Sequence, residues 1–106
     1  MENQYLTGFN IAGFRYYDGT IVFEKLKIGT RLKLKPEPNN AYDPKAVALY
    51  YKKTKLGYVP RGENKLISQM LNLGYKGAFM TIINRISPGE HPESQVGVAV
   101  KVREKK

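Results

Sequence analysis

Alternation of apolar and polar residues in several short stretches predicts a chain made mostly of β-strands. The clearest case is the range 30–35, where Leu32 and Leu34 alternate with three cations. One face of this strand should lie in the core, and the other should carry a row of positive charges. The range 96–102 alternates in the same way and places its four valines on one face. We expect further strands at 5–16, 20–23, 46–51, 56–59 and 78–83.

Turn residues and helical spacing predict how these strands are connected. The Asp18-Gly19 pair favours a turn, so the ranges 5–16 and 20–23 could form a hairpin. The basic run 52–55 is typical of an exposed hairpin loop, and the polar segment 87–92 should join the last two strands. After Pro60 the apolar residues fall at helical spacing and Gly74 is placed to end the segment, which predicts a helix over 61–73.

Several short strands with one or two short helices indicate a mainly β fold, a small OB-like β-barrel of about six strands. The strand pattern alone would also allow an SH3-like barrel. The 106 residues are 42% hydrophobic, and no Pro/Gly/Ser-rich linker divides them. We therefore expect a single domain over 1–106, with a basic C-terminal tail from about residue 101.

Charge is the compositional signal that bears most on function. Eighteen Lys and Arg face nine Asp and Glu, for a net charge of +9, which favours phosphate-rich partners. Basic composition can also serve solubility alone. Cysteine is absent and no apolar run reaches the roughly 18 residues of a membrane helix. We expect a cytoplasmic protein without disulfides or membrane attachment.

Catalytic chemistry has little support in the sequence. The single histidine, His91, lies in a proline-rich loop without serine, cysteine or histidine neighbours at the spacing of a triad or a zinc site. The acidic residues show no paired spacing of the kind metal nucleases use, and the glycines make no phosphate-cradling loop. We therefore expect no enzyme, no cofactor and no metal site.

Two segments carry the residues best suited to binding. Residues 39–44 (Asn-Asn-Ala-Tyr-Asp-Pro) place two amides, a phenol and a carboxylate between two strand-like runs. They could hold a polar ligand or simply form a well-made turn. Residues 13–19 place Arg15 beside Tyr16 and Tyr17. If this segment is a strand, one tyrosine should pack inward and the other should face out.

Together with residues 56–61 (Leu-Gly-Tyr-Val-Pro-Arg), this order of motifs resembles the HIRAN domain over roughly residues 5–75. That domain occurs as a small free-standing bacterial protein and at the N-terminus of some eukaryotic fork-remodelling helicases. The resemblance implies a modified OB-type barrel that binds nucleic acid. Helicase-borne members bind the 3′ end of single-stranded DNA, and the positions matching their pocket are Arg15, Tyr16, Asn40, Tyr42 and Asp43.

Single strands are bound by cations that follow the phosphates and by aromatic faces on which bases stack. A carboxylate repels phosphate, so we expect Asp43 to accept a hydrogen bond from the terminal 3′-hydroxyl. It could instead serve only as an Asx-turn acceptor in its own loop. The basic run 52–55 should add phosphate contacts. The candidate nucleic-acid-binding residues are Arg15, Tyr16, Tyr17, Asn40, Tyr42, Asp43, Lys45, Tyr58 and Arg61.

The chain departs from the helicase pattern at residues 41 and 58. Ala41 stands where a proline often precedes the Tyr-Asp pair, which reduces loop rigidity. Tyr58 stands where the helicase domains can carry a histidine, which exchanges a phosphate contact for a stacking surface. The expected ligand is single-stranded DNA with a free 3′ end. A helicase or nuclease is the expected protein partner, which would act on the bound DNA end. The alternative is a protein-interaction or regulatory β-barrel without a nucleic-acid ligand.

Overall fold

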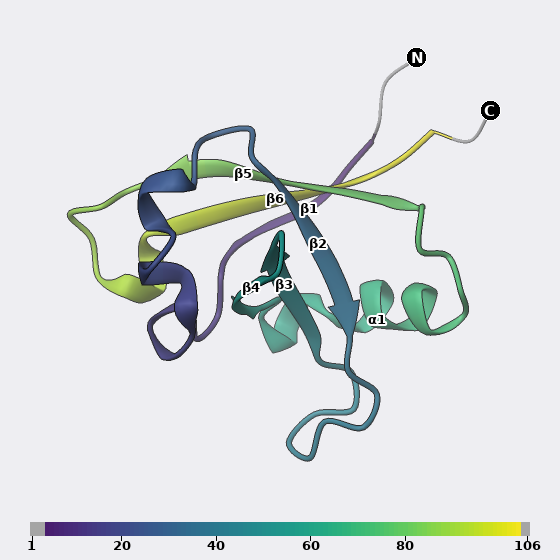
Figure 1. Ribbon diagram of the computed structural model, residues 1–106. Helices are drawn as coiled ribbons and strands as arrows, with labels where there is room; N and C mark the ends of the chain where they lie inside the picture. The colour runs from purple at the N-terminus through teal and green to yellow at the C-terminus, as the bar shows by residue number, and fades with distance from the viewer. Residues whose placement is uncertain (1–3, 105–106) are drawn as a thin grey trace.

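The computed structural model describes residues 4–104 and shows a mainly β fold, as the sequence predicted (Figure 1). Adjacent strands are antiparallel and form one sheet in the order β1-β6-β5-β2-β3-β4. The strands are β1 (Gln4–Asn10), β2 (Arg31–Pro36), β3 (Val47–Tyr51), β4 (Thr54–Tyr58), β5 (Phe79–Ile86) and β6 (Val96–Val102). One α-helix, α1 (Lys65–Asn72), accompanies short 3-10 helices within these residues.

The sheet curls but is not closed into a continuous barrel. In Figure 1, β1, β5 and β6 run together across the molecule, and β2 crosses them. The free edge of β4 meets the chain just after β1, where Ala12 and Tyr58 exchange two backbone hydrogen bonds of 2.9 Å. The bridge therefore connects the segment after β1 with β4, and these two strands are the opposite ends of the sheet order. The fold is therefore OB-like and partly open.

A glycine allows this bridge to form. Gly57 has a φ of +148°, and a Cβ on it would lie 2.4 Å from the carbonyl oxygen of Ala12. Contacts below 3.0 Å with backbone require the chain to move, and L-residues rarely adopt this backbone conformation. Gly57 therefore lets the segment just after β1 approach β4 closely.

The core lies on the inner face of the curled sheet, and α1 contributes to it. Leu32 and Leu34 of β2 join the core, as their alternation predicted. Three of the four β6 valines are at most 1% exposed, and Val102 packs against them. The helix adds the buried residues Ile67 and Leu71. Elements far apart in sequence thus share one apolar centre.

The predictions of a strand over 5–16, a strand over 20–23 and a hairpin between them are wrong beyond residue 10. β1 ends at Asn10 and pairs with β6. Three 3-10 helices follow: η1 (Phe14–Tyr16), η2 (Asp18–Thr20) and η3 (Phe23–Lys25). Gly13, with a φ of +71°, breaks the extended chain. Phe14 is fully buried against Phe23, so the apolar residues serve the core from compact turns.

Two other boundaries need correction. The predicted loop over 52–55 is a two-residue turn, Lys52-Lys53, and Lys55 belongs to β4. The helix predicted over 61–73 has the right place but is shorter, because residues 61–63 form a 3-10 helix, η4 (Arg61–Glu63). Gly74 ends the helix as expected: its φ is +97° and its amide donates to Leu71.

The basic C-terminal segment begins inside the sheet. Lys101 and Val102 lie in β6, and the amide of Arg103 donates to the carbonyl of Ala78 at 2.7 Å. Lys105 and Lys106, the end of the predicted tail, lie outside the described residues. The predicted loop over 87–92 leads into the short 3-10 helix η5 (Pro92–Ser94). Within residues 4–104 no helix has the length and hydrophobicity needed to cross a membrane.

Candidate nucleic-acid interface

A pocket of about 430 Å³ lies where the loop after β2, the η1 segment and the end of β4 meet. Its lining comes from three segments that are distant in the sequence, and the Ala12–Tyr58 bridge joins two of them. Arg15 and Lys45 do not line it. The other seven residues singled out from the sequence do: Tyr16, Tyr17, Asn40, Tyr42, Asp43, Tyr58 and Arg61.

Asn40 organises the loop that forms one side of the pocket. Its side-chain oxygen accepts hydrogen bonds from the amides of Tyr42, at 2.8 Å, and Asp43, at 3.0 Å. Its side-chain nitrogen donates to Glu37 at 3.0 Å. These bonds fix the turn that the sequence predicted, and they place the side chains of Tyr42 and Asp43 at the pocket.

The Asp43 carboxylate is held from two sides. Oδ1 accepts from the amide of Lys45 at 2.9 Å, and Oδ2 accepts from the side chain of Asn64 at 3.0 Å. Arg61 Nε lies 3.8 Å from Oδ2. The Lys45 amide, then Asn64 and the cations, hold the pKa of Asp43 below its usual value. Asp43 is therefore both a turn acceptor and an ionised carboxylate facing the pocket.

Asn64 is a pocket residue that the sequence reading missed. It is only 2% exposed, and its side-chain nitrogen donates to Asp43. An asparagine directly before a helix normally signals an N-cap, yet Asn64 makes no capping bond with its side chain. The position of Asn64 before a helix therefore indicates a helix cap, which is a structural role, and gives no indication of a pocket residue. Its partner lies 21 residues earlier, and only the folded chain brings them together.

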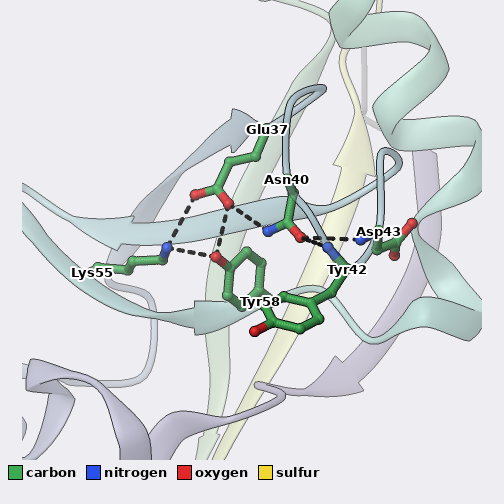
Figure 2. A network of polar contacts seen from close by, with 6 residues as sticks. All are labelled: Glu37, Asn40, Tyr42, Asp43, Lys55 and Tyr58. Atoms are coloured by element: carbon green, nitrogen blue, oxygen red, sulfur yellow. Dashed lines mark hydrogen bonds and ion pairs between the residues drawn. The ribbon is translucent and has the colours of Figure 1, made fainter.

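Tyr58 belongs to a polar network along the pocket wall. Figure 2 shows the Glu37 carboxylate meeting Lys55, Tyr58 and Asn40. The Tyr58 hydroxyl donates to Glu37 Oε1 at 2.7 Å and accepts from Lys55 Nζ at 2.6 Å. Lys55 Nζ lies 3.0 Å from Glu37 Oε2. The network ties β4 to the loop that carries Asn40 and Asp43.

The protonation of this network follows from its burial and hydrogen bonds. Burial raises the pKa of Tyr58 to about 12, and its bond to Glu37 acts in the same direction. Burial also raises the pKa of Glu37, but bonds from Asn40, Tyr58 and Lys55 outweigh it, so the net pKa lies below its usual value. Burial lowers the pKa of Lys55, and its bonds to Tyr58 and Glu37 more than reverse this. Tyr58 stays a neutral phenol between a carboxylate and an ammonium group.

The basic run 52–55 is not one exposed group of cations: Lys52 and Lys53 are exposed, whereas Lys55 is half-buried. Lys55 is paired with Glu37, and its Nζ lies 4.4 Å from the centre of the Tyr58 ring. Lys52 Nζ lies 5.3 Å from the centre of the Tyr51 ring. The strand β4 begins earlier than expected and takes Lys55 into the pocket wall.

Tyr16 and Tyr17 differ in exposure, but not for the expected reason. Tyr16 is 68% exposed. Tyr17 is half-buried and packs edge-on against Tyr58, with ring centres 5.7 Å apart. The prediction that one of the pair enters the core by strand alternation is wrong, because the segment forms 3-10 helices and Phe14 takes the core position.

The cations and the most exposed tyrosine lie at the pocket rim. Arg15 Nη2 donates to the Tyr16 hydroxyl at 2.6 Å, and its guanidinium carbon lies 4.8 Å from the ring centre. Arg61 donates to the Tyr42 carbonyl at 3.1 Å, while its side chain is 73% exposed. Tyr42 itself is 88% exposed. Lys45 is exposed beside the pocket. No group of three or more potential metal ligands occurs among the described residues.

Comparisons with known proteins agree with this architecture. A crystal structure of a protein from Lactobacillus plantarum matches with a TM-score of 0.79 at 20% identity, over 95% of each chain. The HIRAN domain of human HLTF matches with a TM-score of 0.69 at 15% identity, over 93% of this chain and 74% of that one. These identities support the fold alone. No curated protein matches the sequence. The HIRAN domain model matches residues 4–105, and the chain therefore belongs to the HIRAN domain family.

Proposed function

We propose that this protein binds single-stranded DNA and holds the free 3′ end in the pocket. HIRAN domains are nucleic-acid-binding modules, which supports the general class of ligand. The observation that carries the proposal is the convergence of three chemical groups on one cavity. Exposed aromatic faces, an ionised carboxylate and a guanidinium group line it together, from segments up to 45 residues apart, as counted from Tyr16 to Arg61.

The terminal base stacks on Tyr42 in this proposal. Tyr42 is 88% exposed at the pocket, and Tyr16 is 68% exposed. Tyr58 is less suitable as an open platform, because Lys55 lies over its ring and Tyr17 packs against it. A stacked base contributes about 1–3 kcal/mol to single-strand binding.

The terminal hydroxyl donates to Asp43. An ionised carboxylate has about four acceptor positions, and Asp43 uses two of them for the Lys45 amide and Asn64. The remaining positions suit a hydroxyl donor and repel a phosphate. Arg61 has guanidinium donors left beyond its bond to the Tyr42 carbonyl, and these reach the phosphate before the last sugar.

A comparison of oligonucleotide ends tests this assignment. Wild type and Asp43→Asn are each titrated with an oligothymidylate that ends in a 3′-hydroxyl and one that ends in a 3′-phosphate. We expect the phosphate to weaken binding to the wild type and to weaken binding less in Asp43→Asn, which keeps a similar shape but loses the charge.

Glu90→Gln supplies the matched control, because it removes the same charge from an exposed position in the loop after β5. It should leave the end preference unchanged. General attraction to a protein of net charge +9 makes the opposite prediction, in which the added phosphate strengthens binding. A coupling energy of zero between residue 43 and the end group would leave Asp43 as a turn residue only.

A further inference from the structure

The outer face of β2 and β3 carries a group of side chains that the pocket does not use. We name Arg31, Lys33, Lys35 and Tyr50 the basic tract. The three cations are exposed and alternate with Leu32 and Leu34, which point into the core. Tyr50 of β3 is half-buried. The tract therefore lies on the side of β2 away from the core.

Strand register places these residues on one face with the pocket wall. Lys33 is directly opposite Tyr50, and Tyr50 is directly opposite Lys55. Residues directly opposite each other in antiparallel strands project to the same side. Lys35 Nζ lies 5.8 Å from the centre of the Tyr50 ring. Since Lys55 bonds to the Tyr58 hydroxyl in the pocket wall, the basic tract continues from the pocket without an intervening element.

The charges of the basic tract are unpaired. Within residues 4–104, Arg31, Lys33 and Lys35 form no ion pair with an acid. Lys55, by contrast, is neutralised by Glu37. Three free cations beside an aromatic ring are the combination that binds single strands, since the cations follow phosphates and the ring stacks a base. An acidic protein could also be attracted by the three cations. Such binding would leave unexplained the Tyr50 ring among them and the continuity of the basic tract with the pocket.

We infer that the basic tract binds the nucleotides on the 5′ side of the one held in the pocket. This inference rests on the proposed function, because the pocket fixes which end of the strand arrives there. Neighbouring strands lie about 4.8 Å apart, so Tyr50 and Lys33 lie about 5 and 10 Å from Lys55. At about 3.4 Å per stacked nucleotide, the tract accommodates about three nucleotides beyond the pocket.

The test compares a short and a long ligand. Lys33→Gln/Lys35→Gln and wild type are titrated with a dithymidylate and with a ten-residue oligothymidylate, both with free 3′-hydroxyls. The dithymidylate fills only the pocket, so its affinity should stay within twofold. For the ten-residue strand we expect a loss of about 20-fold at 0.1 M salt and a salt slope smaller by about 1.4, because each phosphate contact contributes about 0.7.

Lys65→Gln/Lys76→Gln is the matched control for net charge. Lys65 lies on α1, whose buried side packs into the core, and Lys76 follows the helix. Both are exposed, and the double variant loses the same two charges. This control variant should lose much less affinity for the ten-residue oligonucleotide than the tract variant does. Tyr50→Thr removes the ring but leaves a residue that favours strands at this position of β3. It should weaken binding of the longer oligonucleotide only, by about fivefold or more.

The outcomes separate the two proposals. Equal losses in both double variants, or an equal loss for both ligand lengths, would overturn the basic tract. The tract variant could lose affinity for the ten-residue oligonucleotide only, while the wild type binds 3′-hydroxyl and 3′-phosphate ends equally. That result would overturn the end pocket and support the basic tract. A third outcome is that Lys33→Gln/Lys35→Gln loses affinity for poly-glutamate but binds the ten-residue oligonucleotide as the wild type does. The basic tract would then be a protein-binding surface, and the inference would be wrong.

Discussion

Gly57→Ala should destabilise the protein by removing the bridge that joins β4 to the segment after β1. The new Cβ would lie 2.4 Å from the Ala12 carbonyl oxygen and 2.6 Å from Ile11 Cγ2, so one of the two segments must move. Movement breaks the two hydrogen bonds between Ala12 and Tyr58, which are worth about 0.5–1.5 kcal/mol each. Holding alanine at a φ of +148° costs about 1–3 kcal/mol more.

The expected loss is therefore about 2–6 kcal/mol, a large part of the 5–15 kcal/mol that typically stabilises a domain. Urea unfolding followed by circular dichroism gives this free energy directly, and the melting temperature should fall by about 8 °C or more. The bridge also holds Tyr17 against Tyr58, so affinity for single strands should fall in the folded fraction.

Gly62→Ala is the control, because a Cβ on Gly62 meets no atom within 4 Å. It should change the free energy of unfolding by no more than about 1 kcal/mol in either direction. If Gly57→Ala is as stable as Gly62→Ala, the bridge contributes nothing measurable and the reasoning is wrong.

Three further predictions concern the pocket. Tyr42→Ala should weaken single-strand binding by about 1–3 kcal/mol while leaving the melting temperature within about 2 °C, because the side chain is 88% exposed; a large fall in stability would contradict this. Glu37 and Asp43 both have pKa values below their usual values of 4.5 and 3.8. The stability that they contribute is therefore present above those usual values and is lost as the pH falls through the lowered pKa values. Glu37→Gln should reduce the difference between the free energies of unfolding at pH 6 and pH 3. Asn64→Ala should raise the pKa of Asp43 in a carboxyl NMR titration and reduce the preference for a free 3′ end, whereas Asn72→Ala at the exposed end of α1 should do neither.

The strands whose residues alternate strictly were predicted most accurately. In β2 and β6, apolar residues at every second position reach the same core, so local periodicity and tertiary burial agree. Gly74 ended the helix as expected because its conformation is favourable only for glycine. The segment after Asn10 was predicted wrongly because Phe14 and Phe23 pack in the core from 3-10 turns. Their apolar side chains look the same in sequence whichever backbone carries them.

The candidate site shows the same division. The motifs around Tyr16, Tyr42 and Tyr58 are local in the sequence, so their composition indicated binding and their order indicated the family. The pairing of Lys55 with Glu37 spans 18 residues, and that of Asn64 with Asp43 spans 21. No local pattern encodes such contacts, because they depend on how β4, the loop after β2 and the start of α1 come together.

Strand content, basic character and the motifs that identify the family could thus be predicted from the amino-acid sequence. Each of these depends on residues that are near neighbours in the chain or on composition alone. Three properties emerge only in the folded chain: which cations remain without an ion pair, which tyrosines are exposed and which carboxylate faces the pocket. Those properties depend on burial and on partners distant in sequence, since a charge or a ring becomes available only when the fold leaves it unpaired.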